Sequence, residues 1–328
     1  MIRFIIKRVL TMIPVLIGVV FAIFTIMYFT PGDPTEIILG TSAKPAEYEA
    51  LREKLGMNDP YVVQLGRYLY QVFIKGDIGT SWVYGTSIMD EIWARFPRTA
   101  MLALIGMVIT IIVGIPLGVS AAVHHNGVID KIVLAITIAL NAMPGFWLAM
   151  LMVVLFAVEL RWLPAMGIGG PKYYIMPVIA NSLIGVAETA RQTRSCMLEV
   201  INSDYVMMAR AKGLSERRVL YRHALPNGMI PLLTVIGSGL AVTLGGSIII
   251  ENVFSIPGMG QYLSSAIANH DYPIIRAIVI FLAIFFNIII LLIDLSYGFA
   301  DPRIKARYAE SSKRRKKYKP ERTVKANG

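Results

Sequence analysis

The sequence predicts an all-α, polytopic membrane protein with six transmembrane helices. Its 328 residues are 55% hydrophobic and only 16% charged, whereas about 25% of the residues of an ordinary soluble domain are charged. Six uncharged runs approach the roughly 20 residues that a helix needs to cross about 30 Å of hydrocarbon. They lie at residues 9–29, 99–123, 132–158, 173–187, 229–250 and 277–293. This composition excludes a soluble globular domain and a disordered chain.

The first run follows the basic residues Arg3, Lys7 and Arg8, as the apolar part of a signal peptide would. It is longer than such a segment, and it ends in the turn-forming residues 30–34 rather than at a small-residue cleavage site. We therefore interpret residues 1–29 as a cytoplasmic segment followed by an uncleaved first span.

The positions of the basic residues predict the orientation. If the N-terminus is cytoplasmic, most of the 32 Lys and Arg residues fall on the cytoplasmic side, as the positive-inside rule requires. Both termini are therefore expected in the cytoplasm. The tail at 299–328 contains a nearly continuous basic run at 313–319, which we interpret as a solvated segment that contacts anionic lipid, not nucleic acid.

The predicted spans carry almost no ionisable residues away from their ends. Glu188 and Asp294 lie at cytoplasmic ends, and Arg98 and Arg276 lie at outer ends. Ionisable groups inside a membrane mark proton relays and ion paths, so an ATP-independent secondary transporter is only a remote alternative. The sequence has no phosphate-binding loop and no catalytic or metal-binding motif. The chain is therefore predicted not to be an enzyme, to hold no cofactor or metal, and to take its energy from a partner.

The segment 203–226, between the fourth and fifth runs, has the most specific pattern. Helix formers extend from Asp204 to Lys212, with an acid at the start and a base at the end, which suits the helix dipole. Gly213 fits the left-handed position that ends a helix. We expect a helix–glycine–helix elbow that can dock into a groove of a partner. A DNA-reading helix-turn-helix and a purely structural loop are the alternatives.

The second arm of the elbow has its own end signals. Ser215 is a candidate N-cap for a short helix that begins at Glu216, and Pro226 is expected to help to close that helix.

The elbow also resembles a known signature. Ala209 and Gly213, followed after nine residues by the run His223-Ala224-Leu225-Pro226, are similar to the E-A-A-x-x-x-G-x9-I-x-L-P motif (the EAA motif) of binding-protein-dependent ABC importer permeases. Met207, Met208 and His223 stand where that motif has Glu, Ala and Ile.

Further stretches extend the resemblance, in order, over the chain before the basic tail. They are residues 30–34, 76–81, 114–118, 143–147, 194–199, 209–214, 251–260, 271–273 and 301–303. Together they resemble the dipeptide/oligopeptide/nickel permease family, in the subunit type with a long loop after the first span.

The resemblance implies one permease subunit of an ATP-driven, binding-protein-dependent importer in a prokaryotic inner membrane. It implies a type I ABC importer permease fold, working by alternating access. The permease core would cover residues 92–296, with spans at about 99–123, 132–158, 173–195, 229–250 and 276–296. Di- or oligopeptides are the expected substrates, and nickel or another metal complex is the alternative. Expected partners are a second homologous permease, two cytoplasmic ATPases that bind ATP and Mg, an extracytoplasmic binding protein and membrane lipid.

The resemblance also assigns the ATPase contact to residues of the elbow. They are Ala209, Arg210, Lys212, Gly213, Glu216, Leu225 and Pro226. We expect Ala209 and Gly213 to form a contact edge that permits close approach. The basic residues Arg210, Lys212, Arg217 and Arg218 either pair with acidic ATPase groups or form a solvated face.

Outside the membrane, two segments are of interest. Residues 30–98 contain a helical, aromatic stretch at 61–74, which suggests a small cap that helps to receive the binding protein or a simple covering loop. Pro257-Gly258 predicts a turn by which the chain re-enters. Candidate residues of the translocation path or gate are Glu251, Pro257, Gly258 and Gly245. Glu251 either contacts a peptide amine or serves as a structural carboxylate at a helix end.

Overall fold

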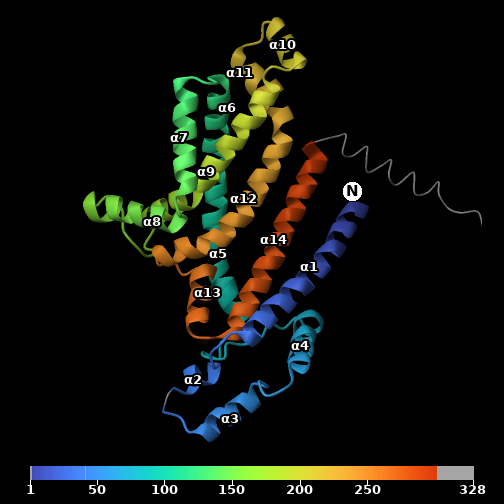
Figure 1. The fold of residues 1–328 in the computed structure, drawn as a ribbon, viewed down its shortest axis with the longest axis vertical. Helices are drawn as coiled ribbons and strands as arrows, with labels where there is room; N and C mark the ends of the chain where they lie inside the picture. The colour runs from blue at the N-terminus through green and yellow to red at the C-terminus, as the bar shows by residue number, and fades with distance from the viewer. Residues whose placement is uncertain (1, 41, 301–328) are drawn as a thin grey trace, which may run out of the picture.

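The computed structural model describes residues 2–40 and 42–300 of the chain, and its regular elements are helices, apart from one bridge between Thr80 and Ser87 (Figure 1). The N-terminal elements are α1 Ile2–Phe29, α2 Pro34–Leu39, α3 Pro45–Lys54, α4 Tyr61–Tyr70 and the π-helical η1 Gln71–Lys75. The central elements are α5 Ile88–Ile109, η2 Thr110–Gly114, α6 Ile115–Val123, α7 Val128–Ala142, α8 Gly145–Met152, η3 Val153–Glu159 and α9 Lys172–Val200. The C-terminal elements are α10 Asp204–Ala211, α11 Glu216–Arg218, η4 Val219–Ala224, α12 Leu225–Val253, α13 Met259–Ala268 and α14 Tyr272–Ala300.

Three helical runs among the described residues are long and apolar enough to cross a membrane. They are Ile5–Phe29, Ile88–Val123 and Tyr272–Ile293. The predicted basic tail lies outside the described residues from position 301 onward.

The run predicted as one span at 132–158 is not a single straight helix. Instead α7 and the α8–η3 segment form a pair that is bent by 104° and passes the same test only together. Met143 is extended, with φ −90° and ψ 132°, and Pro144 follows it. A proline excludes the α conformation from the preceding residue and donates no N–H, so the helix breaks at this point.

Helix α9 lies at the centre of the bundle and packs against α5, α6, α7, α8 and α12. Its contact with α6 is close because a Cβ added at Gly118 would overlap the carbonyl oxygen of Ala190. Gly114, one turn earlier, faces Thr189 in the same way. Small residues at this spacing let two helix backbones approach each other within a membrane.

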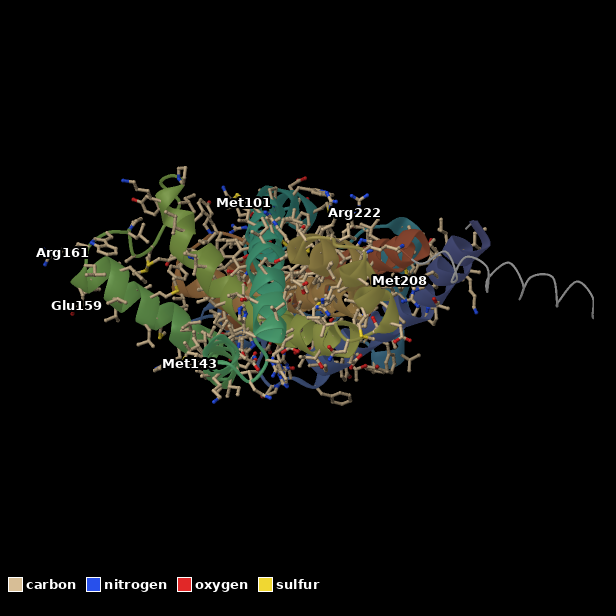
Figure 2. All side chains as sticks on the ribbon, turned by 90° about the horizontal axis from the view of Figure 1, so that it is seen from above. Met101, Met143, Glu159, Arg161, Met208 and Arg222 are labelled. Atoms are coloured by element: carbon tan, nitrogen blue, oxygen red, sulfur yellow. The ribbon has the colours of Figure 1, made fainter. Side chains whose placement is uncertain are left out.

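The two ends of the bundle differ in what they carry (Figure 1). The elbow (α10 and α11) lies at the same end as the N-terminus of the chain and the C-terminal end of α14. Helices α2, α3 and α4 lie at the opposite end. The α8–η3 segment, which we call the lateral arm, extends sideways from the bundle, and Figure 2 places Glu159 and Arg161 at its tip.

The long segment after α1 is helical, as the aromatic pattern at 61–74 predicts. Helices α4 and η1 together cover residues 61–75, and Gly76 ends them in the left-handed conformation. Tyr61 and Tyr68 pack against Phe24 of α1, with ring centroids 5.8 and 5.5 Å apart. We call α2, α3, α4 and η1 the cap.

Candidate functional site

The elbow forms at the position that the sequence predicts. Helix α10 begins at Asp204, and Gly213 adopts a left-handed conformation with φ +73°. The N–H of Gly213 donates to the carbonyl of Arg210 at 2.9 Å. Glycine reaches this conformation without the steric cost that a Cβ would add, so the chain reverses at an exposed glycine. The second short helix starts at Glu216, after Ser215.

An apolar core joins the elbow to the transmembrane helices. Val206 and Ala209 of α10 are buried in one cluster with Val219 and Leu220 of η4 and with residues of α6, α9 and α12. Ala209 is 5% exposed. The prediction that Ala209 forms a surface contact edge is therefore wrong, since its side chain points into the elbow's own core.

Pro226 does not close the second helix of the elbow, contrary to the prediction. Helical structure continues without interruption from α11 through η4 into α12. The N–H of Leu225 donates to the carbonyl of Leu220, five residues back. This wider turn makes room for a proline ring, which would otherwise clash with the carbonyl four residues earlier.

Two of the predicted ATPase-contact residues bind each other. The Arg210 guanidinium lies 2.8 Å from the Glu216 carboxylate and also donates to the carbonyl of Ile201 at 3.1 Å. The hydrogen bond and charge of Arg210 hold the pKa of Glu216 below its ordinary value. This pair braces the two arms of the elbow against each other.

The exposed side of the elbow is apolar with basic neighbours. Tyr205, Met207 and Met208 are 42%, 51% and 60% exposed, and Lys212 and Arg217 are also exposed. Figure 2, which views the molecule from above relative to Figure 1, labels Met208. We call these five residues and Gly213 the elbow surface. The sequence analysis did not select Tyr205, Met207 and Met208 as contact residues. The signal for them was that α10 carries apolar residues on its exposed face as well as on its buried face.

At the other end of the bundle, Glu251 is fully buried and accepts several hydrogen bonds. The Thr99 hydroxyl donates to it at 2.6 Å, and the backbone N–H groups of Gly260 and Gln261 donate at 2.7 and 3.3 Å. Thr99 in turn accepts from the N–H of Met259 at 2.9 Å. Glu251 thus fastens the start of α13 to α5 and α12, which favours the structural alternative over contact with a peptide amine.

The other candidate gate residues separate into two groups. Pro257 accepts a hydrogen bond from Arg98 at 3.2 Å, and a Cβ added at Gly258 would overlap the Glu251 carboxylate. Both therefore belong to the same turn as Glu251, which we call the outer brace. Gly245 is exposed on α12, and no atom outside its own helix lies within 4 Å of an added Cβ.

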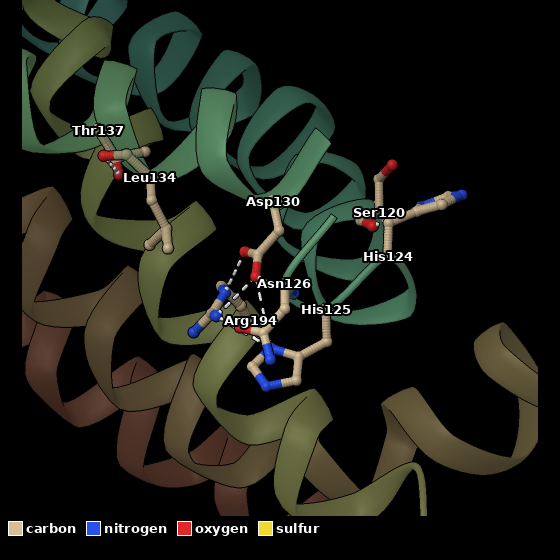
Figure 3. Close-up of polar contacts among 8 residues, drawn as sticks. All are labelled: Ser120, His124, His125, Asn126, Asp130, Leu134, Thr137 and Arg194. Atoms are coloured by element: carbon tan, nitrogen blue, oxygen red, sulfur yellow. Dashed lines mark hydrogen bonds and ion pairs between the residues drawn. The ribbon is translucent and has the colours of Figure 1, made fainter. Parts of the chain in front are cut away.

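An ion pair that the sequence reasoning missed lies near the elbow end of α9. Arg194 donates to both carboxylate oxygens of Asp130, at 2.5 and 2.8 Å (Figure 3). The two residues are 64 positions apart in the sequence, so no local pattern predicts the contact.

The fold is similar to that of a solved structure. It resembles a structure titled "Inward facing conformations of the MetNI methionine ABC transporter" with a TM-score of 0.56 and 17% sequence identity, over 65% of this chain and 97% of the other. At this identity the likeness concerns the fold alone.

The family follows from the sequence comparisons. Residues 114–306 match the family described as the binding-protein-dependent transport system inner membrane component, and residues 1–103 match its N-terminal companion family. The dipeptide transport system permease protein DppB of Alkalihalophilus pseudofirmus is 39% identical over 333 residues, covering 93% of this chain and all of the relative, 100%. The glutathione transport system permease protein GsiC of Salmonella paratyphi A is 36% identical over 305 residues, covering 93% and 99%. The chain therefore belongs to the family of inner membrane permeases of binding-protein-dependent transport systems.

Proposed function

We propose that this chain is one of two homologous permease subunits of an ATP-driven importer of di- or oligopeptides. The observation that carries the proposal is similarity, at 36% to 39% identity and over more than nine-tenths of the chain, to permeases named for dipeptide, peptide and glutathione transport. The second permease, two cytoplasmic ATPases and an extracytoplasmic binding protein complete the transporter. ATP and Mg bind to the ATPases.

In this proposal the chain crosses the membrane six times, with both termini in the cytoplasm. The spans are α1, α5 with α6, α7 with the lateral arm, α9, α12 and α14. The location of the N-terminus and of the C-terminal end of α14 at the elbow end supports this orientation (Figure 1). The basic residues of the elbow fit the cytoplasmic side.

The elbow surface is the proposed contact with an ATPase. Met207 and Met208 offer flexible apolar side chains that adapt to a groove, and Lys212 and Arg217 offer charges for acidic groups at its rim. Arg210 and Glu216 keep the elbow in shape through their own pair. The partner groove therefore has an apolar floor and an acidic edge.

At the outer end the cap is proposed to help to receive the binding protein. Its helices present exposed side chains such as Val62 and Ile74, which are 74% and 71% exposed. The outer brace then closes the permease beneath the cap. Closure of the ATPase pair displaces the elbow, and the shared apolar core passes this movement to α6, α9 and α12, which opens the path to the outside.

The test is purification of the complete complex, followed by ATPase and uptake assays in proteoliposomes. The chain is expressed with the second permease, both ATPases and the binding protein. We expect hydrolysis and uptake to be stimulated by binding protein together with a dipeptide or tripeptide. Stimulation by a nickel complex but by no peptide would reassign the substrate, and uptake without ATPase subunits would refute the proposal.

A matched pair of variants tests the elbow surface. Met208→Asp should reduce recovery of the ATPases with the permease, because it places a charge in an apolar contact. Val128→Asp, at an apolar position outside the elbow that is 73% exposed, should leave recovery unchanged. Equal recovery of ATPases with both variants would contradict this assignment of the contact.

A further inference from the structure

The residues that helix α7 buries in the bundle are polar, not apolar. Its only buried residues are Asp130 and Thr137, while Ile132, Ile136 and Ile138 are more than half exposed. The Thr137 hydroxyl donates to the carbonyl of Leu134 within the same helix. An apolar core therefore contributes little to holding α7 in place, and Asp130 is its main buried polar anchor.

Asp130 is 1% exposed, and both oxygens of its carboxylate accept hydrogen bonds. Besides the two bonds from Arg194, its carboxylate accepts the backbone N–H of Asn126 at 2.9 Å, and Nδ1 of His125 lies 3.4 Å away (Figure 3). A buried carboxylate is tolerated only where such partners compensate for the lost hydration. The two parallel bonds from one guanidinium also fix orientation as well as distance.

The partner, Arg194, lies where α6 and α9 approach each other closely. A Cβ at Gly118 of α6 would lie 3.0 Å from the backbone nitrogen of Arg194, so α6 and α9 touch at this residue. Immediately beyond it, Cys196 and Met197 enter the apolar cluster that contains Val206 of the elbow. Arg194 thus stands on the part of α9 that is built into the elbow's core.

We propose that the Asp130–Arg194 pair is a positioning element that transmits displacement of the elbow to α7 and the lateral arm. Arg194 moves with the elbow because the two share one core, and the ion pair obliges α7 to follow. Helix α7 leads directly into the lateral arm across the 104° bend. The pair would therefore link the proposed ATPase contact to the lateral arm, which extends sideways from the bundle (Figure 1). This inference rests on the proposed function of the elbow.

The test compares substitutions at the pair with a control on the same helix. Arg194→Gln and Asp130→Asn are measured for peptide transported per ATP hydrolysed, in the complete complex. We expect each to lower this ratio at least about fivefold, which is the lower end of ordinary coupling between sites. Arg191→Gln is the control, because Arg191 lies one turn away and pairs only with the exposed Glu188 in the part of the chain described. It should leave the ratio unchanged.

A charge swap separates transmission from folding. If the variants that remove one charge fail to assemble, Asp130→Arg combined with Arg194→Asp is measured instead. Recovery of an assembled complex with a substantially restored ratio supports the proposal. A swapped complex that stays uncoupled, or that does not assemble, overturns it. An unchanged ratio in assembled Arg194→Gln also overturns it.

A distance measurement tests transmission without peptide. Spin labels at Ile136 of α7 and Ser215 of the elbow, in a Cys196→Ala background, report their separation with and without trapped ATP. The wild-type pair should keep one distance in both states, whereas Arg194→Gln should show a nucleotide-dependent distance. Identical behaviour of the two proteins would overturn the inference. A wild-type complex without binding-protein-stimulated hydrolysis would instead refute the proposed function.

Discussion

The two ends of the permease each bury a carboxylate, but they neutralise it differently. Asp130, at the elbow end, faces a guanidinium from another helix. Glu251, at the outer end, is held by a hydroxyl and by backbone N–H groups. A pair of opposite charges joins two elements that meet side chain to side chain. A carboxylate held by N–H groups shapes the turn that supplies them, and that turn has little freedom to rearrange.

At the outer end, Arg276 likewise has uncharged partners, which are aromatic rings. The Arg276 guanidinium lies 5.1 Å from the ring of Phe24, 5.0 Å from that of Tyr68 and 5.7 Å from that of Trp82. These rings come from α1, from the cap and from the loop before α5. At these sites, therefore, the elbow end neutralises its buried charge with an opposite charge, whereas Glu251 and Arg276 at the outer end have uncharged partners.

The largest expected effect tests the shape of the outer brace. Gly260→Ala places a Cβ against the backbone of Ile248, and the loss of stability should reach about 3 kcal/mol, the upper part of the range for overpacking. Thermal unfolding of the purified protein in detergent measures it. Gly245→Ala is the control, since that position is open, and it should gain about 0.5–1 kcal/mol from better helix propensity. Equal effects at the two glycines would show that the brace is not tightly packed.

The next effect tests whether the neutral donors need a charged acceptor. Glu251→Gln replaces one acceptor oxygen by an amide NH₂, so that one of the donors around it loses its acceptor. The free energy of unfolding should fall by about 2 kcal/mol. Thr99→Val removes the hydroxyl donor, and the double variant should cost less than the two single changes added together. A double-mutant cycle on unfolding midpoints measures this coupling. Strict additivity would mean that Thr99 and Glu251 do not act together.

A smaller effect tests the aromatic site of Arg276. Arg276→Met keeps an apolar stem but removes the attraction to three rings, which is worth about 0.5–2 kcal/mol. Because α4 carries one of these rings, limited proteolysis should cut residues 30–87 faster. Arg98→Met, which removes a hydrogen bond to Pro257 at the same end, should not change the cutting of this segment. Unchanged proteolysis in Arg276→Met would show that the cap is held by other contacts.

The smallest effect concerns the exposed pair inside the elbow. The pKa of Glu216 is lower than its ordinary value of 4.5 because Arg210 donates to it. The pair therefore stabilises the elbow above that pH, and its contribution is lost as the pH falls through the lowered pKa. Glu216→Gln should cost at most about 1 kcal/mol at neutral pH, as exposed pairs do. Melting temperatures of the two proteins should converge in acid, and a constant difference would contradict this account.

Local patterns in the sequence predicted what depends on local structure. The positive φ of Gly213 and the aromatic helix of the cap follow from short-range spacing, and the structure confirms both. The prediction that Pro226 helps to end the helix was wrong, because a wide helical turn accommodates the proline ring. No sequence pattern indicates such a turn. The inward orientation of Ala209 was missed because a small residue suits a core as well as a surface.

The pairing of Asp130 with Arg194 was beyond any local argument. The two residues are far apart in the sequence, and the contact can be predicted only once it is known that the α6–α7 hairpin packs against α9. The assignment of Glu251 needed the same information, since its donors come from residues on both sides of a turn and from a different helix.

The uninterrupted helix that runs from 216 to 253 has a mechanical consequence. It extends from the elbow to Glu251, so one continuous helical segment of 36 residues, with a contour length of roughly 55 Å at 1.5 Å per residue, connects the elbow to the outer brace. The π-helical turn at Val219–Ala224 and Pro231 are the two places where such a helix bends. In the proposed transporter, a displacement of the elbow would reach the outer brace through this one helix, and the stiffness of its two bending points would set how much of the displacement arrives.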